Sequence, residues 1–144
     1  MKLSKNDDIK MNIDSLTSEG SGIGRFDGFA VFVRGVVPGD EVVAHIIKCS
    51  KNYAIGVVKD IIKPSKFRIE SDCPVSSKCG GCSFRNVSYD EELRYKKGRV
   101  QDALERIGKL DIEVEEIIGA DKCSHYRNKA QYPVSVSYTH LTLP

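Results

Sequence analysis

Three cysteines lie close together in the middle of the chain, and they are the residues of this sequence best placed to do chemistry. The stretch CPVSSKCGGCSF contains Cys73, Cys79 and Cys82, with five residues between the first two and two glycines between the last two. Thiolates are soft ligands that select zinc, copper(I) or iron–sulfur clusters. The glycines let the backbone wrap closely, so that its amides can reach a bound group. The spacing therefore favours a metal centre on this loop.

The number of clustered thiolates indicates which centre this is. Structural zinc sites usually combine two close pairs of ligands, whereas this loop has one close pair and a third cysteine six residues before it. Three clustered thiolates with a fourth from a distant segment are typical of a [4Fe–4S] cluster. We favour that cluster, with Cys73, Cys79 and Cys82 as ligands. Zinc and a redox-active Cys79–Cys82 pair remain as alternatives.

Composition and charge indicate the broad class of protein. The chain has 144 residues, of which 40% are hydrophobic and 29% charged, as in soluble globular proteins. The net charge of +2 is too small to indicate a polyanionic partner by itself. The N-terminus MKLSKNDDIK lacks the apolar core of a signal peptide, and no run of apolar residues is long enough to span a membrane. We expect a cytoplasmic, monomeric protein with reduced cysteines and no membrane partner.

The elements before the cysteines read as short strands divided by turns. Residues 9–13 alternate between apolar and polar, the period of a half-buried strand. Asp27-Gly28 is a dipeptide typical of tight hairpins, and a Pro-Gly-Asp turn follows at 38–40. A small closed barrel buries more than a flat sheet of short strands and leaves no exposed edge. The sequence thus predicts a mainly β fold with a five-stranded OB-like barrel over 1–62.

The period changes after the cysteine loop, which we assign to residues 63–87. Ser88 and Glu91 match a capping box, and apolar residues then recur at helical spacing, which predicts one long helix over 89–107. Further along, IEVEEII and KAQYPVSVS alternate like strands. We therefore expect residues 88–144 to begin a truncated α+β domain.

With these motifs in view, the chain resembles the N-terminal part of the bacterial 23S ribosomal RNA uracil-C5 methyltransferases. The resemblance covers about residues 5–137 and is carried by the barrel sequence, the cysteine loop and the stretch YRNKAQYPV. It implies that the barrel is a TRAM domain, which binds RNA, and that the three loop cysteines are cluster ligands. The family's fourth ligand lies several dozen residues after the CGGC motif. Cys123 is too early for that place, so we do not assign it.

The resemblance also implies a reaction. Family members transfer a methyl group from S-adenosylmethionine to C5 of a flipped-out uracil, after a cysteine adds to C6. That cysteine and the cofactor domain belong to the family's C-terminal half, and this chain has no Gly-rich strand-to-helix loop followed by an acidic residue. We expect an N-terminal fragment that is inactive alone and has no catalytic or cofactor-binding residue. The alternative is a standalone RNA-binding module with a zinc or iron–sulfur site.

The closing SYTHLTLP does not follow the family and resembles a translated adapter, so we expect roughly the last eight residues to be artefactual.

Candidate RNA contacts fall in two groups, and the expected partner is ribosomal RNA. OB-like barrels bind RNA with basic side chains and stacking aromatics. In the second group, arginine and lysine could bridge phosphates and asparagine could read a base edge. For any single barrel residue, the alternative is an ordinary surface or core side chain. The candidates are, on the barrel, Arg25, Phe26, Lys48, Lys51 and Tyr53, and beyond the helix, Tyr126, Arg127, Asn128 and Lys129.

Overall fold

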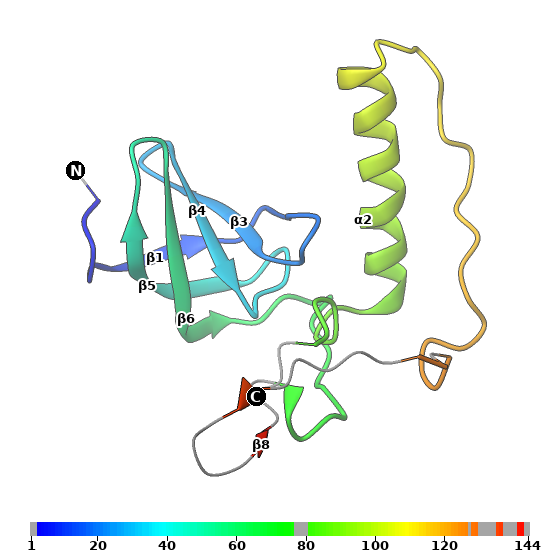
Figure 1. Ribbon diagram of the computed structural model, residues 1–144. Helices are drawn as coiled ribbons and strands as arrows, with labels where there is room; N and C mark the ends of the chain where they lie inside the picture. Colours follow the sequence, from blue (N-terminus) through cyan, green and yellow to red (C-terminus); the bar gives the residue numbers. More distant parts are fainter. Residues whose placement is uncertain (1–2, 77–80, 127, 130–134, 137–140, 143–144) are drawn as a thin grey trace.

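The computed structural model describes residues 3–76, 81–126, 128–129, 135–136 and 141–142 (Figure 1). In the described part of the chain, no helix is long and apolar enough to cross a membrane. The strands are β1 (Asp8–Asn12), β2 (Ser15–Leu16), β3 (Gly22–Phe26), β4 (Phe29–Arg34), β5 (Glu41–Cys49), β6 (Tyr53–Lys63), β7 (Ser135–Val136) and β8 (Leu141–Thr142), and the helical elements are α2 (Tyr89–Asp102) and the π-helix η1 (Ala103–Ile107).

The N-terminal strands form one sheet that closes on itself. Its order is β1-β5-β6-β4-β3-β2, with β4 and β6 parallel and the other neighbours antiparallel. The first and last strands of this order are consecutive in the chain, separated by Ile13 and Asp14. The N–H of Ile13 donates to the carbonyl of Asp40 (2.9 Å), whereas the next N–H, of Asp14, donates to Ile23 (2.8 Å). One bent strand therefore bridges both edges of the sheet and closes the barrel.

This arrangement confirms the predicted mainly β class and barrel-like fold. The sheet has six strands rather than the predicted five: after β1, which matches the strand expected over 9–13, the chain bends and continues as the short β2, which the sequence did not predict. The predicted hairpin turn is also confirmed, since Asp27 and Gly28 both have positive φ (48° and 80°). Gly24 lies where β3 crosses β1; a Cβ there would meet the Asn12 carbonyl oxygen at 2.2 Å.

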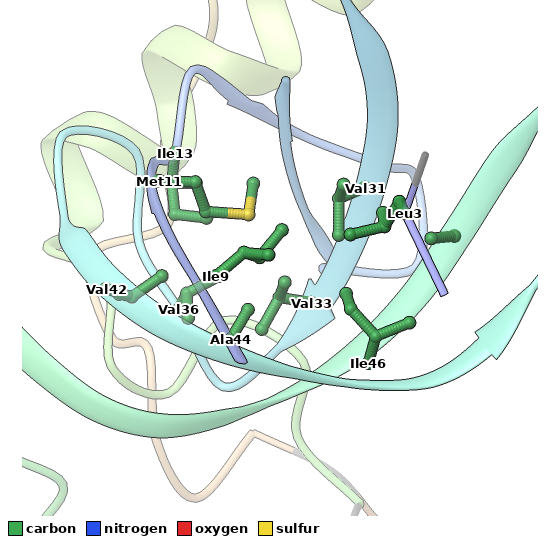
Figure 2. Close-up of a cluster of buried hydrophobic side chains, with 11 residues drawn as sticks. Leu3, Ile9, Met11, Ile13, Val31, Val33, Val36, Val42, Ala44 and Ile46 are labelled. Atoms are coloured by element: carbon green, nitrogen blue, oxygen red, sulfur yellow. The ribbon is translucent and has the colours of Figure 1, made fainter. Parts of the chain in front are cut away.

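The barrel interior is a core of aliphatic side chains (Figure 2). Alternation along each strand selects these residues: on β4, Val31 and Val33 point inward and are fully buried, while Phe32 between them is only half-buried. Figure 2 shows the core side chains converging from several strands. The labelled members are Leu3, Ile9, Met11, Ile13, Val31, Val33, Val36, Val42, Ala44 and Ile46.

A second, smaller core joins the barrel to the region after the cysteines. Its buried members are Leu16, Val37 and Val87, and three half-buried aromatic side chains pack against them, including Tyr95 of α2. The Tyr95 hydroxyl donates to the carbonyl of Leu16 at 2.7 Å. The cysteine loop also touches the barrel at Gly20, where a Cβ would lie 2.6 Å from that of Ser83. The loop and the base of α2 are thus docked onto the barrel.

The predicted helix over 89–107 is confirmed, because α2 continues directly into η1. The predicted capping box is wrong. Ser88 occupies the N-cap position, but its side chain makes no capping hydrogen bond. Glu91 is nearly buried and pairs instead with Arg94, whose guanidinium lies 4.6 Å from the centre of the Phe67 ring.

The strand predicted for IEVEEII, residues 112–118, is not present. This segment runs back beside α2 in extended form (Figure 1). Side chains of the helix hold its backbone: Gln101 accepts from the N–H of Val114 (2.7 Å), and Lys97 donates to the carbonyl of Glu115 (2.8 Å). Part of the strand predicted for KAQYPVSVS, residues 129–137, is β7, which pairs with β8 further along the chain. Residues 130–134 and 137 lie outside the described residues.

Candidate nucleic-acid interface and metal centre

A pair of aromatic rings, one half-buried and one exposed, lies on the outer face of the barrel. Because side chains alternate along a strand, Phe32 points away from the core that Val31 and Val33 fill. The Phe32 and Tyr53 rings meet edge to face, with centroids 5.8 Å apart and planes at 79°. Tyr53 is 38% exposed. The pair therefore presents aromatic surface to solvent.

Basic side chains flank this pair on two sides. In the strand register, Arg25 of β3 and Tyr53 of β6 are both neighbours of Ala30 on β4. On the other side, Lys48 of β5 lies opposite Ile55, which is itself opposite Phe32. Arg25 and Lys48 are exposed. We call Arg25, Phe32, Lys48, Tyr53 and Ile55 the outer patch.

The structure brings together three of the barrel residues predicted to contact RNA, namely Arg25, Lys48 and Tyr53. Lys51 lies in the turn between β5 and β6 and is exposed. Phe26 instead packs against the barrel core, so the alternative reading of this residue is confirmed.

Phe32 of the outer patch is absent from the predicted contacts. The alternation in FAVFVR could have identified it, because Phe32 and Arg34 fall on the face opposite the buried valines.

The positive charges near the patch differ in how far they are already neutralised. Asp8 accepts hydrogen bonds from Lys59 and, at 2.6 Å, from His45 Nδ1. These bonds, first that of Lys59 and then that of His45, lower the pKa of Asp8 below its usual value. Lys48 and Arg34, in contrast, have no ion-pair partner within the described parts of the chain. Their charges are available to a ligand.

The described cysteines of the loop are free thiols. Cys73 is half-buried in a turn, where its carbonyl accepts from the N–H of Ser76 (3.2 Å), and Cys82 is exposed. Cys79 lies outside the described residues. Among the residues that are described, no three metal-ligating side chains come together. The three-cysteine site therefore stays a prediction.

A hollow of about 810 Å³ lies between the cysteine loop, the base of α2 and the segment near residue 120. Cys82 lines it, and so does Cys123, which the sequence analysis leaves unassigned. Lys96 also lines it, and its hydrogen bond to Glu92 (2.5 Å) raises the pKa of the lysine. Tyr126, a member of the second group of predicted RNA contacts, lines this hollow as well.

The other members of that group are not part of the hollow's described lining. Asn128 and Lys129 are exposed, and Arg127 lies outside the described residues.

Residues 8–59 match the family model of the TRAM domain. The fold and the comparison together identify the barrel as a TRAM domain, as predicted.

Two relatives extend the similarity beyond the barrel. An uncharacterized RNA methyltransferase of Listeria monocytogenes serotype 4b is 44% identical over 140 residues, which are 97% of this chain and 31% of the relative. Another from Clostridium tetani is 44% identical over 130 residues, 90% of this chain and 28% of the relative. Along nearly all of its own length the chain is thus similar to proteins named RNA methyltransferases, in line with the resemblance carried by its motifs, and it spans less than a third of these relatives.

Among solved structures, the Pyrococcus abyssi tRNA (uracil-54, C5)-methyltransferase in complex with S-adenosyl-L-homocysteine superposes with a TM-score of 0.44 and 23% sequence identity. The match covers 72% of this chain and 22% of that protein.

Proposed function

We propose that this chain is the N-terminal, RNA-holding part of an S-adenosylmethionine-dependent RNA uracil-C5 methyltransferase, with ribosomal RNA as its substrate. In this proposal, the outer patch binds a single-stranded stretch of that RNA. The observation that supports it best is the pair of the half-buried Phe32 and the exposed Tyr53, flanked by Arg25 and Lys48 on a TRAM barrel.

The chemistry of the patch suits an unpaired strand. Every base has a π-face that can stack on an aromatic ring, and exposed phosphates attract arginine and lysine. Bases within a duplex are already stacked on one another, so a side chain can take only a base that is unpaired or splayed out. A substrate whose uracil must leave its stack before methylation offers such a region.

The proposal also assigns Cys73, Cys79 and Cys82 as three ligands of a [4Fe–4S] cluster. An all-thiolate donor set suits iron–sulfur chemistry, and the two described thiols are free to bind. The cluster would cross-link the loop, and a structural role fits because methyl transfer moves no electrons. What this chain's own residues supply is the docking of that loop, through the contact of Ser83 with Gly20.

The methyl transfer itself is proposed to depend on residues outside this chain. The family reaction needs a nucleophilic cysteine and a cofactor-binding domain. Residues 1–144 would bind and orient RNA, and we expect no methyl transfer from labelled S-adenosylmethionine by this chain alone. Transfer by the chain alone would contradict that division of roles.

Binding of a fluorescent single-stranded oligouridylate to the 144-residue chain tests the proposal. Removing a stacking ring costs roughly 1–3 kcal/mol per base, so Tyr53→Ala and Phe32→Ala should each weaken binding by about 5- to 150-fold. Tyr53→Phe is the matched control, because it keeps the ring, and it should bind like the unmodified chain. Equal affinities for Tyr53→Ala and the unmodified chain would overturn the assignment of the patch.

A further inference from the structure

A second hollow separates the barrel from the cysteine loop and contains about 690 Å³. One wall comes from the barrel and includes Arg34, the last residue of β4. The opposite wall comes from the cysteine loop and includes Ser83, Arg85 and Asn86. We call this hollow the loop groove. It begins two residues beyond Phe32 on the same face of β4, so it continues the surface of the outer patch.

The walls of the loop groove are held in place by contacts on either side. Ser83 packs directly against Gly20, which also lines the groove. Behind it, the buried Val87 side chain joins Leu16 and Val37 in the smaller core. A ligand would therefore enter a preformed groove, without the cost of ordering a loop.

The groove carries positive charge from both walls. Arg34 is exposed and has no ion-pair partner in the part of the chain that the structure describes. Arg85 is paired with Asp72, whose side chain is 79% exposed. Exposed ion pairs contribute little, so a phosphate can replace the Asp72 carboxylate as the partner of Arg85. Glu19 is an acidic residue on the same lining.

We propose that the loop groove receives the sugar–phosphate backbone of the RNA strand as it leaves the outer patch, with Arg34 and Arg85 each binding a phosphate. Arginine suits this role because its planar guanidinium can bind phosphate oxygens in a bidentate manner. This inference rests on the proposed RNA binding by the barrel and adds a direction to it. The strand passes from Tyr53 over Arg34 toward the cysteine loop.

RNA strands of two lengths distinguish binding in the loop groove from binding on the outer patch. Binding of oligouridylates of about 4 and about 12 nucleotides, which bracket the site sizes of OB folds, is measured on the 144-residue chain. The longer strand reaches the groove. Arg34→Ala and Arg85→Ala should each weaken binding of this longer strand by about 10-fold. Each should also make the fall of the logarithm of the binding constant with the logarithm of the salt concentration less steep, by about 0.7 per lost phosphate contact. Binding of the shorter strand should not change.

A variant that improves binding makes the test independent of folding defects. Asp72→Asn frees Arg85 and should strengthen binding of the longer strand several-fold. Asp102→Asn is its matched control, because it frees Arg106 from a similar exposed pair at the far end of α2. If Asp72→Asn has no more effect than Asp102→Asn, or if the arginine variants weaken both strands equally, the groove assignment is wrong. If the unmodified chain binds neither strand, the proposed RNA binding itself fails.

Discussion

Arg68 holds its guanidinium 2.5 Å from the carboxylate of Asp40, a side chain that is fully buried. The same carboxylate accepts hydrogen bonds from the backbone N–H groups of Val37 (2.7 Å) and Ser65 (2.8 Å). Burial by itself raises the pKa of Asp40, but Arg68 and the two N–H groups together outweigh it and hold the pKa below the usual 3.8. The connector after β6 is thereby fixed to the turn before β5, so the cysteine loop leaves the barrel from an anchored point.

Arg68→Ala is expected to lower the free energy of unfolding by about 3 kcal/mol, because it leaves the buried Asp40 carboxylate without its charge partner. Urea unfolding followed by circular dichroism measures the loss. Arg106→Ala is the control, since it breaks an exposed pair with Asp102 and should change stability by less than about 1 kcal/mol. Similar losses of unfolding free energy in the two variants would show that the buried Arg68–Asp40 pair contributes no more than an exposed one.

The depressed pKa of Asp40 predicts how stability depends on acid. A carboxyl group whose pKa is lower in the folded state stabilises the fold fully above its unfolded pKa, here 3.8, and this contribution is lost as pH falls through the folded value. Asp40→Asn lacks the titrating group. The stability difference between the unmodified chain and Asp40→Asn should therefore shrink as the pH is lowered below about 4, as urea midpoints would show. A constant difference would mean that Asp40 does not titrate with unfolding.

The same substitution at two glycines should have opposite effects. Gly24→Ala places a Cβ 2.2 Å from the Asn12 carbonyl oxygen, where the barrel closes, and should destabilise by about 1–3 kcal/mol or more. Gly98 lies inside α2 with open space around the position of a Cβ. Gly98→Ala should stabilise by about 0.5–1 kcal/mol, because alanine loses less backbone freedom in a helix. Thermal melting of both variants measures the signs, and destabilisation by Gly98→Ala would contradict the open helix surface.

Metal loading tests the cysteine loop. After anaerobic reconstitution with iron and sulfide, Cys73→Ser and Cys82→Ser should lose bound iron and cluster absorption, because thiolates are the cluster's ligands. Cys49→Ser, at the end of β5, is the control and should load like the unmodified chain. Zinc bound in place of iron and sulfide would favour the alternative centre. Loss of the cluster in Cys123→Ser would add Cys123, which lines the same hollow as Cys82, to the cluster's ligands.

The barrel could be predicted because its signals are local. The alternation of Val31, Phe32 and Val33 and the Asp27-Gly28 turn act over a few residues. The bend between β1 and β2 could not be predicted, since the consecutive N–H groups of Ile13 and Asp14 find their acceptors in two distant segments, at Asp40 just before β5 and at Ile23 of β3. Residues 112–118 show the converse: their alternation fits a strand, yet a strand needs a neighbour, and in the described structure the helix supplies that segment's hydrogen bonds.

For the candidate site, the residue types could be predicted from the sequence, but their positions relative to one another could not. Arg25, Lys48 and Tyr53 are named by their chemistry, but their grouping with Phe32 follows from the register of β3, β4, β5 and β6. The loop groove depends on a contact between Gly20 and Ser83, residues far apart in the chain. No local pattern reports such a contact.

Tyr95→Phe tests the link between α2 and the barrel. The hydroxyl of Tyr95 donates to the Leu16 carbonyl at 2.7 Å, so its removal should cost about 1 kcal/mol of unfolding free energy in urea at neutral pH. Burial raises the pKa of Tyr95, and the fold therefore favours the protonated phenol. The contribution of Tyr95 is fully present below the unfolded pKa of about 10 and is lost as pH rises through the folded value. The advantage of the unmodified chain over Tyr95→Phe should thus disappear in alkaline solution, and an advantage that persists there would show that the hydroxyl is not what joins the two elements.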